Sequence, residues 1–377
     1  MKTFRIILGT MLAAAMLLIL GAVQAEVIQI DPDHTQHVFD ESRTCVHCGW
    51  KEPGFWQEGE LLLTWQELKD MGYVTVTGDG RLTEVSGNLD GLLVIGEDVT
   101  KADGNFYILF SNCPTLKQVW FPRTITELGR HLINRTNIEE VRLFCPITEL
   151  GDDAFSQSLN KKPTLTSVWL PSTLKSIGRE AFQACSQLSD LVLPDSVETL
   201  GSESLCGTSL TQINMPSHLK QVKAAAFGYT SIERIVLPPT VEELDTYTFE
   251  GSGVKYVDLS GLTWLKKLPD QIFRGCYRLE EVVLPPHLER FGWACFGGTN
   301  SLKRISLPDG FVDLGNTWMD DVEEMVWPVS LVDVTLERPK NLKSILYRGS
   351  EKQWKLCAAN SKWNLSGVEM TFDYQGE

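Results

Sequence analysis

The stretch SVWLPSTLKSIGREAFQAC, residues 167–185, places an apolar strand-like piece and a helix-like piece within fewer than twenty residues. This is too short for an ordinary βα unit, since a βαβ unit needs about 30 residues or more. The same arrangement of apolar residues and proline recurs directly afterwards, in DLVLPDSVETLGSESLCG (190–207), QINMPSHLKQVKAAAFG (212–228) and RIVLPPTVEELDTYTFEG (234–251). The sequence is therefore built from one small repeated unit.

The first half of each unit reads L-x-x-V-x-L followed by proline. Its leading apolar residue recurs every 20 to 23 residues, with two longer spacings of 27 and 25 residues. This column consists of Leu116, Ile138, Leu165, Leu188, Leu210, Ile232, Val254, Leu279, Leu302, Val322 and Leu342. The period lies in the leucine-rich-repeat range. The alternation at the end of the motif predicts a short strand, which the proline ends because it has no N–H to donate.

The second half of each unit carries a Leu or Ile often followed by glycine, then an aromatic column and a small residue three positions later. The aromatic column is Phe155, Phe182, Leu205, Phe227, Phe249, Phe273 and Phe296. The glycine is expected to relieve a tight bend, and the small residue to let the next coil approach. Because one unit cannot bury its own apolar face, the units are expected to stack around a continuous core.

The pattern L-x-x-V-x-L-P-x-x-L-x-x-I-G-x-x-A-F-x-x-C, matched nearly letter for letter by Leu165–Cys185, resembles the treponemal, or BspA-like, class of bacterial leucine-rich repeat. The resemblance covers about Leu92 to Tyr347 and departs at Ser260, which replaces the proline, and at Lys223 and Asp245, which replace the glycine. It implies an exported surface or secreted binding protein, often tied to adhesion, without catalysis. The segment after Tyr347 resembles the C-terminal cap of such proteins.

The predicted fold is an α+β repeat, a leucine-rich-repeat solenoid. We expect a right-handed coil with a short parallel β-sheet on the concave side and an irregular or 3-10 convex side. Four segments follow: a signal peptide at 1–25, a Cys/His-containing segment at 26–58, a solenoid of about 11 coils with an N-terminal cap at 59–345, and a C-terminal cap at 346–377.

The first residues have the pattern of an export signal. Lys2 and Arg5 precede the uncharged apolar run Ile6–Gly21, and the small residues of Ala22–Ala25 predict cleavage after Ala25. An uncleaved membrane anchor is the alternative, although the run is short for a bilayer. The sequence therefore predicts a protein that is secreted or at the cell surface, with no membrane insertion after cleavage.

The net negative charge of the chain limits the classes of molecule that it can bind. The 377 residues carry a formal net charge of −15, and 43% of them are hydrophobic. An acidic chain lacks the basic face that general nucleic-acid binding requires, and it is not attracted to anionic lipid. The expected partner is an extracellular protein or a glycan. The sequence leaves the oligomeric state open.

Nine cysteines are present, an odd number. Cys113, Cys185 and Cys276 occupy the small-residue column, three and four coils apart. Coils stack about 5 Å apart, so these gaps far exceed the Cα separation of about 4.4–6.8 Å that a disulfide requires. We predict that these three are core thiols.

The segment HTQHVFDESRTCVHCGWKEPG, residues 34–54, stands apart from the repeats. His34, His37, Cys45 and Cys48 give H-x-x-H and C-x-x-C, a set that suits one tetrahedral Zn²⁺ with no open position and hence a structural role. The alternatives are a Cys45–Cys48 disulfide and a reduced pair with no metal. No other cofactor is expected. The segment also resembles a short H-x-F…C-x-x-C-G stretch of exported gut-type bacterial proteins.

No enzyme is predicted. The sequence contains no G-x-S-x-G, H-E-x-x-H, P-loop or G-x-G-x-x-G pattern. Cys206 and Cys295 lie at repeat positions where packing accounts for them.

A candidate ligand site comes from the phase of the strands. In L-x-x-V-x-L the last x faces away from the core, and on three successive strands this position holds Trp120, Arg142 and Trp169. Trp and Arg are the residues that most often carry binding energy at interfaces. Alternatively, these side chains only cover the sheet and stack on one another. A weaker set is Tyr256 with Lys255 and Arg304. The sequence as a whole predicts a non-catalytic binding module, or else a structural solenoid with no specific ligand.

Overall fold

The computed structural model describes residues 37–46, 48–102, 109–158, 162–331, 338–358 and 363–376. The predicted signal peptide and His34 lie outside these residues. Within the described ranges, no helix is both long enough and apolar enough to cross a membrane.

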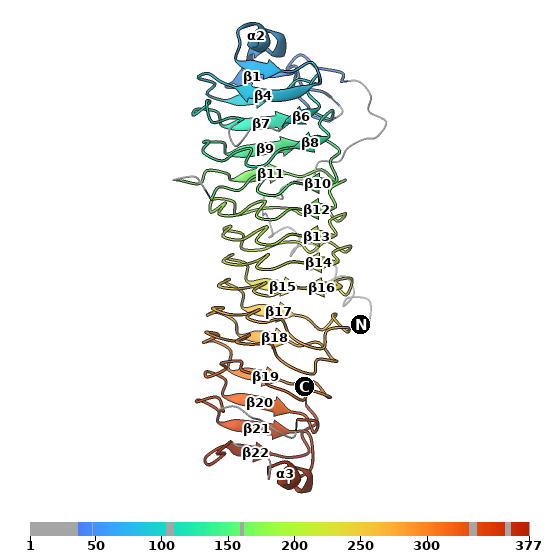
Figure 1. Cartoon of the computed structure of the whole chain (residues 1–377), viewed down its shortest axis with the longest axis vertical. Helices are drawn as coiled ribbons and strands as arrows, with labels where there is room; N and C mark the ends of the chain where they lie inside the picture. The colour runs from blue at the N-terminus through green and yellow to red at the C-terminus, as the bar shows by residue number, and fades with distance from the viewer. Residues whose placement is uncertain are drawn as a thin grey trace, which may run out of the picture.

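The described chain forms an elongated stack of coils, most of which contribute a strand to one side of the stack (Figure 1). These strands form three mainly parallel sheets in line, β2 to β11, β15 to β18 and β19 to β22, which together are called the first sheet. The strands of its N-terminal part are β1 (Gly54–Gln57), β2 (Glu60–Thr64), β5 (Leu92–Val94), β7 (Gln118–Phe121), β9 (Glu140–Leu143) and β11 (Ser167–Trp169). Farther along come β15 (Arg234–Val236), β17 (Tyr256–Asp258), β18 (Glu281–Val283), β19 (Arg304–Ser306), β20 (Glu324–Trp327), β21 (Ser344–Tyr347) and β22 (Glu369–Thr371). Val119, Val141 and Val168 are paired in register and buried, which confirms the predicted solenoid with parallel sheets.

The middle of the first sheet is interrupted. Residues 190–194 and 212–216 form no strand, and Asn214 takes over the pairing there. Its side-chain oxygen accepts a hydrogen bond from the Leu193 N–H (2.9 Å), and its amide nitrogen donates to the Leu193 carbonyl (2.7 Å). The Asn214 side chain thus satisfies the N–H and carbonyl of Leu193, which have no strand partner at this point.

A second set of short strands, called the second ladder, runs along the coils in two sheets, one from β3 to β8 and the other from β10 to β16. Its strands are β3 (Val74–Val76), β4 (Arg81–Val85), β6 (Lys101–Ala102), β8 (Glu127–Leu128), β10 (Glu149–Leu150), β12 (Ser176–Ile177), β13 (Thr199–Leu200), β14 (Gln221–Val222) and β16 (Glu243–Leu244). Only β3 pairs antiparallel. The helix-like reading of IGREAF is wrong, because residues 176–177 are a strand and residues 179–184 are turns. The 3-10 character expected on this side is not confirmed.

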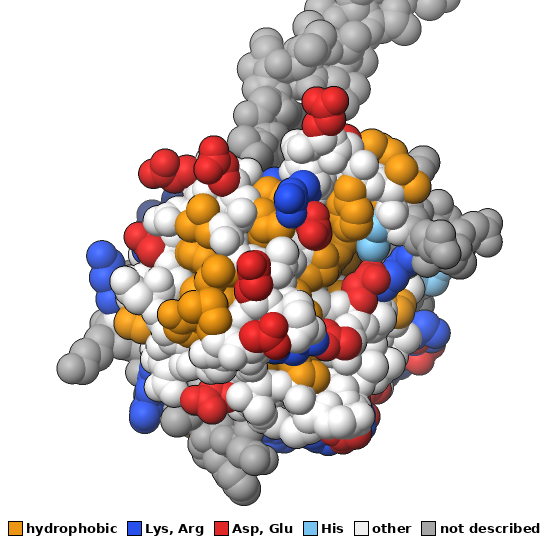
Figure 2. Space-filling model, turned by 90° about the horizontal axis from the view of Figure 1, so that it is seen from above, with side chains coloured by type: hydrophobic (Ala, Val, Ile, Leu, Met, Phe, Trp, Pro, Cys, Tyr) orange, Lys and Arg blue, Asp and Glu red, His pale blue; other side chains and the backbone are white. Residues whose placement is uncertain are grey.

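Helices are confined to the two ends of the described stack (Figure 1). At the N-terminal end, α2 (Trp65–Asp70) is capped reciprocally by the Thr64 and Glu67 side chains. At the other end lies α3 (Glu351–Ala358). Seen from the α2 end, hydrophobic side chains are interspersed with acidic and basic ones (Figure 2). Leu62 and Met71 are among the exposed hydrophobic residues of this part of the chain.

One continuous core runs from Phe55 to Trp363. Its regular part is the aromatic column, in which the Phe227, Phe249, Phe273 and Phe296 rings stack on one another at 5.8, 5.5 and 5.4 Å between centroids. Leu205 interrupts the column, and Phe155 and Phe182 continue it on the other side at 5.6 Å. The predicted aromatic column is therefore the spine of the core.

The turns around this column are held in left-handed backbone conformations. Two residues before the column position, which Ile133 occupies in the coil before Phe155, φ lies between 48° and 59° in eight coils: His131, Asp153, Glu180, Glu203, Ala225, Tyr247, Gln271 and Ala294. Two residues after it, φ is positive at Arg135, Ala184, Gly207, Tyr229, Gly251, Gly275 and Gly298. The conformation aims the N–H groups of alternate residues at the next coil: Glu180, Phe182 and Ala184 each donate to a carbonyl of residues 202–206 at 2.8 Å.

The repeat glycines have a different role from the one expected. Gly178 and Gly201 do not have positive φ, so no unusual bend requires them. A Cβ at Gly178 would lie 2.7 Å from backbone atoms of residues 150–152, and one at Gly201 would lie 2.6 Å from the Gly178 carbonyl carbon. These glycines permit close stacking of neighbouring coils.

The buried aromatic column generates a stability prediction. Phe182→Ala is expected to lower the free energy of unfolding by about 3–5 kcal/mol, because Phe182 is fully buried. Trp169→Ala is expected to cost clearly less, since Trp169 lies on the outer side of the sheet and is partly exposed. Urea denaturation followed by circular dichroism measures both. Equal losses would contradict the strand phase.

The left-handed turns generate a second prediction. Ala225→Gly is expected to raise the free energy of unfolding by about 1 kcal/mol, because a Cβ is disfavoured at φ 53°. The matched control is Ala226→Gly, at the adjacent buried position without positive φ, which is expected to lose about 1 kcal/mol. The same denaturation experiment compares them. Destabilisation by both substitutions would show that the left-handed residue is not strained.

The buried thiols generate a third prediction. Cys113, Cys185 and Cys276 are fully buried thiols, and the Cys185 and Cys276 sulfurs contact the carbonyls of Phe155 and Phe249 at 3.2 and 3.0 Å. Burial raises the pKa of Cys113 and Cys276 to about 12 and raises that of Cys185 as well. Iodoacetamide at pH 8 is expected to label the partly exposed Cys357 and to leave these three unlabelled until the chain is denatured. Mass spectrometry gives the sites, and labelling of any of the three in the native protein would contradict the core placement.

Candidate functional site

The predicted Trp–Arg–Trp stack forms. Strands β7, β9 and β11 pair in parallel so that Trp120 lies opposite Arg142 and Arg142 lies opposite Trp169. The Arg142 guanidinium carbon lies 4.5 Å from the centroid of the Trp120 ring and 3.9 Å from that of Trp169. The Arg142 Nε also forms an ion pair with Glu140 on the same strand. Such cation–π pairs are worth about 0.5–2 kcal/mol each.

Trp120 is not available as an exposed ligand contact, which corrects the expectation that all three side chains face solvent. Only 5% of its surface is exposed, because the front segment, residues 37–46 and 48–50, lies over it. Trp50 of that segment is 1% exposed, and its ring centroid lies 6.4 Å from that of Trp120 and 4.9 Å from that of Phe144. Arg142 and Trp169 remain partly exposed beside this contact. Their role in binding remains a prediction.

The front segment is organised by a few local contacts. Isolated antiparallel bridges join Phe39 to Cys45 and Thr44 to Lys51. The Asp40 carboxylate accepts hydrogen bonds from the Ser42 hydroxyl and from the N–H groups of Thr44 and Ser42. These bonds lower the pKa of Asp40, and the bond from the Ser42 hydroxyl lowers it most. Gly49, at φ 71°, turns the chain after Cys48 so that the Cys45 N–H donates to the Trp50 carbonyl at 2.6 Å.

Three of the four predicted metal ligands converge in this segment. The ligand atoms of His37, Cys45 and Cys48 all lie within 4.8 Å of one another, with His37 Nδ1 3.5 Å from Cys48 Sγ. Cys45 and Cys48 are both thiols, not a disulfide. Burial raises the pKa of Cys48 to about 11. The fourth predicted ligand, His34, lies outside the described residues.

Sequence reasoning missed one partner of this cluster. The other imidazole nitrogen of His37, Nε2, lies 2.9 Å from a carboxylate oxygen of Glu97, in the turn after β5. Glu97 has no repeat signature and is far from His37 in sequence, so no spacing rule identifies it. His37 thus connects the front segment to the solenoid.

The weaker predicted set does not form as expected. Tyr256 carries the guanidinium of Arg234 from the neighbouring strand at 3.7 Å, and Lys255 pairs with Glu233 at 2.9 Å. Arg304 lies farther along, where its Nε pairs with Glu324 at 3.2 Å and its Nη2 donates to the Tyr374 hydroxyl at 3.0 Å. The arginine that contacts Tyr256 is therefore Arg234, and not the predicted Arg304.

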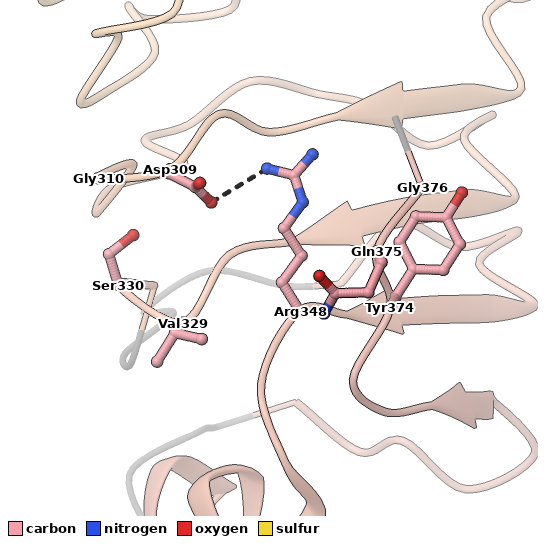
Figure 3. Close-up of a pocket in the computed structure, with 8 residues that line it drawn as sticks. All are labelled: Asp309, Gly310, Val329, Ser330, Arg348, Tyr374, Gln375 and Gly376. Atoms are coloured by element: carbon pink, nitrogen blue, oxygen red, sulfur yellow. Dashed lines mark hydrogen bonds and ion pairs between the residues drawn. The ribbon is translucent and has the colours of Figure 1, made fainter.

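Two hollows adjoin the C-terminal part of the first sheet. One of about 820 Å³ lies over Val283 and Ser306 and is bordered by Arg304 and Arg348. The other, of about 660 Å³, lies between Asp309, Val329 and the C-terminal residues from Tyr374 (Figure 3). The Arg348–Asp309 ion pair, at 3.1 Å, borders both. Both hollows are open to solvent and do not enclose a small molecule as a ligand cavity does.

One histidine cluster has the composition of a catalytic triad but not its geometry. Asp195 Oδ2 lies 2.8 Å from the Ser217 hydroxyl, and both oxygens approach the same His218 nitrogen, Nδ1, at 3.4 and 3.2 Å. A general base needs the carboxylate on one ring nitrogen and the nucleophile on the other. The Asp195 and His218 side chains are each 67% exposed. This cluster therefore does not support hydrolysis.

The stacked coils, the two parallel ladders and the aromatic spine define a leucine-rich-repeat solenoid. The family described as BspA type leucine rich repeat region matches the chain in six copies over residues 99–162, 158–265 and 266–325, and the chain belongs to this family.

Several solved structures are similar to the chain. A leucine rich cell surface protein from Faecalibacterium prausnitzii A2-165 is 19% identical over 75% of this chain and 95% of its own, with a TM-score of 0.38. A leucine-rich repeat protein from Bacteroides ovatus ATCC 8483 is 19% identical over 80% and 98%, with a TM-score of 0.39. The pneumococcal vaccine antigen PcpA is 20% identical over 79% and 96%, with a TM-score of 0.40. No curated protein matches the chain.

Proposed function

We propose that the chain is an exported, non-catalytic binding module that recognises an extracellular protein or glycan through the outer side of its first sheet, in cell-surface adhesion. Its family membership and the predicted export signal support this proposal. The outward residues of the first sheet support it further.

The observation that carries the proposal is the pattern of burial along these outward residues. Trp120 and Val326, near the two ends, are 5% and 0% exposed. Between them Trp169, Asp258 and Ser306 are partly exposed, and Val236 is 43% exposed. The sheet is thus covered near both ends and open in its middle.

Trp169 is the best anchor on this open stretch. Its ring is held against the Arg142 guanidinium at 3.9 Å, so binding would freeze little additional side-chain motion. A flat indole offers an apolar surface to a sugar ring or a peptide side chain. Arg142 contributes less to anion binding than its type indicates, because Glu140 already neutralises it.

The test starts from a screen of residues 26–377 against a glycan array and immobilised extracellular-matrix proteins. Trp169→Ala is then expected to weaken the retained interaction about thirtyfold, the loss of ~2 kcal/mol that is typical of an aromatic anchor. Surface plasmon resonance measures the affinity. Trp120 is left unchanged in this test, because it is buried under the front segment.

The matched control is Trp293→Ala, which removes a tryptophan that is 48% exposed in the turn between β18 and β19, outside the first sheet. Its affinity is expected to equal that of the unchanged protein. Equal affinity of the Trp169→Ala variant would remove the ligand from this side of the sheet. Failure of the unchanged protein to retain any glycan or matrix protein would favour the structural solenoid instead.

A further inference from the structure

We propose that His37, Cys45 and Cys48 bind one zinc ion that fastens the front segment to the solenoid, with Glu97 positioning His37 from the solenoid side. This site is independent of the proposed recognition surface, because the metal would act on the attachment of the segment and not on a ligand.

The ligand geometry fits a tetrahedral ion. Zinc takes thiolate sulfur at about 2.3 Å and imidazole nitrogen at about 2.0–2.1 Å, so two such ligands at the tetrahedral angle lie about 3.6 Å apart. His37 Nδ1 and Cys48 Sγ lie 3.5 Å apart. The Cys45 sulfur lies within 4.8 Å of both atoms, so a small movement brings it into the same coordination sphere.

The ligand types select zinc. Two thiolates and an imidazole are soft to borderline donors, which disfavour magnesium and calcium and suit tetrahedral zinc. These three ligands occupy three of the four positions of a tetrahedral zinc site.

Glu97 supplies the contact that metal-bound histidines usually have. A histidine that binds metal through one ring nitrogen donates its other N–H to a carboxylate or carbonyl, which fixes the tautomer and the ring orientation. His37 Nε2 lies 2.9 Å from the Glu97 carboxylate, leaving Nδ1 toward Cys48. Because Glu97 belongs to the solenoid, the same contact ties the cluster to it.

A metal cross-link would compensate for the weak attachment of the segment by its own backbone. The described residues of the front segment pair only through the isolated bridges Phe39–Cys45 and Thr44–Lys51 and belong to no named strand. Trp50 nevertheless covers Trp120 and Phe144, and its ring stacks on that of His37 at 6.0 Å between centroids. Zinc would link His37, which stacks on Trp50, to Cys45 and Cys48, and so keep these rings together.

The first experiment measures metal. Residues 26–377 are purified under reducing conditions, incubated with one equivalent of zinc and desalted. The protein is expected to retain about one zinc per chain, measured by inductively coupled plasma mass spectrometry. Cys48→Ser is expected to lose it, whereas Cys206→Ser, at a partly exposed cysteine outside the cluster, is expected to keep it. No retained zinc in the unchanged protein, or a Cys45–Cys48 disulfide in the native protein, would overturn the site.

The second experiment separates positioning from folding. Glu97→Gln is expected to weaken zinc affinity 10- to 100-fold in a competition with a chromogenic chelator, and to regain one zinc per chain at saturating zinc. Cobalt substitution gives a readout besides affinity, since the thiolate charge-transfer band is expected to keep its intensity in this variant. An unchanged affinity would exclude Glu97 from the site.

The third experiment tests the fastening. Arg43, whose side chain is 53% exposed, lies between the predicted ligands and is a trypsin site. Chelation of the unchanged protein is expected to accelerate cleavage after Arg43 at least tenfold, and zinc is expected to restore protection. The circular dichroism of the solenoid is expected to stay unchanged. Equal cleavage rates with and without zinc would overturn the fastening role, whatever the outcome of the ligand screen.

Discussion

Main-chain hydrogen bonding between successive coils is the constraint on which the rest of this structure depends. In the strands the bonds form two parallel ladders, and in the turns the left-handed residues aim alternate N–H groups at the next coil. A buried N–H without a partner is costly, so each coil must follow the register of its neighbour around most of its circumference. The cost of holding non-glycine residues such as Glu180 and Ala225 at positive φ is therefore offset by the hydrogen bonds that they form with the next coil.

This constraint explains which side chains the repeat tolerates. Small residues follow the aromatic column because they bond to it: Thr208 and Thr230 donate to the carbonyls of Leu205 and Phe227. Glycine recurs where two backbones meet within van der Waals distance. Where the ladder of the first sheet fails, Asn214 supplies a donor and an acceptor from its side chain. The residue types at the repeat positions are thus determined by hydrogen bonding and by close backbone spacing as much as by hydrophobic burial.

The periodic part of the fold was predictable and the non-periodic part was not. The columns at Val168 and Phe182 identify the solenoid, its parallel strands and its core, because burial repeats with the coil. The second ladder was missed, since a two-residue strand such as Ser176–Ile177 is too short to show alternation. The stack of Arg142 on two tryptophans followed from strand register. The cover over Trp120 did not, because it depends on how a segment without repeats folds back onto the sheet.

The covering of Trp120 changes what the Trp–Arg–Trp stack does. Arg142 is sandwiched between two rings and neutralised by Glu140, so it has little capacity left for an anionic ligand. Its stack instead continues into Trp120, Trp50 and His37, which joins the open part of the sheet to the Cys/His cluster through a chain of ring contacts. Whatever fixes His37 therefore also fixes the rings beneath it, and Trp169 is the last ring of that chain before the open surface. Recognition and attachment are separate tasks in this protein, but they share one set of stacked side chains.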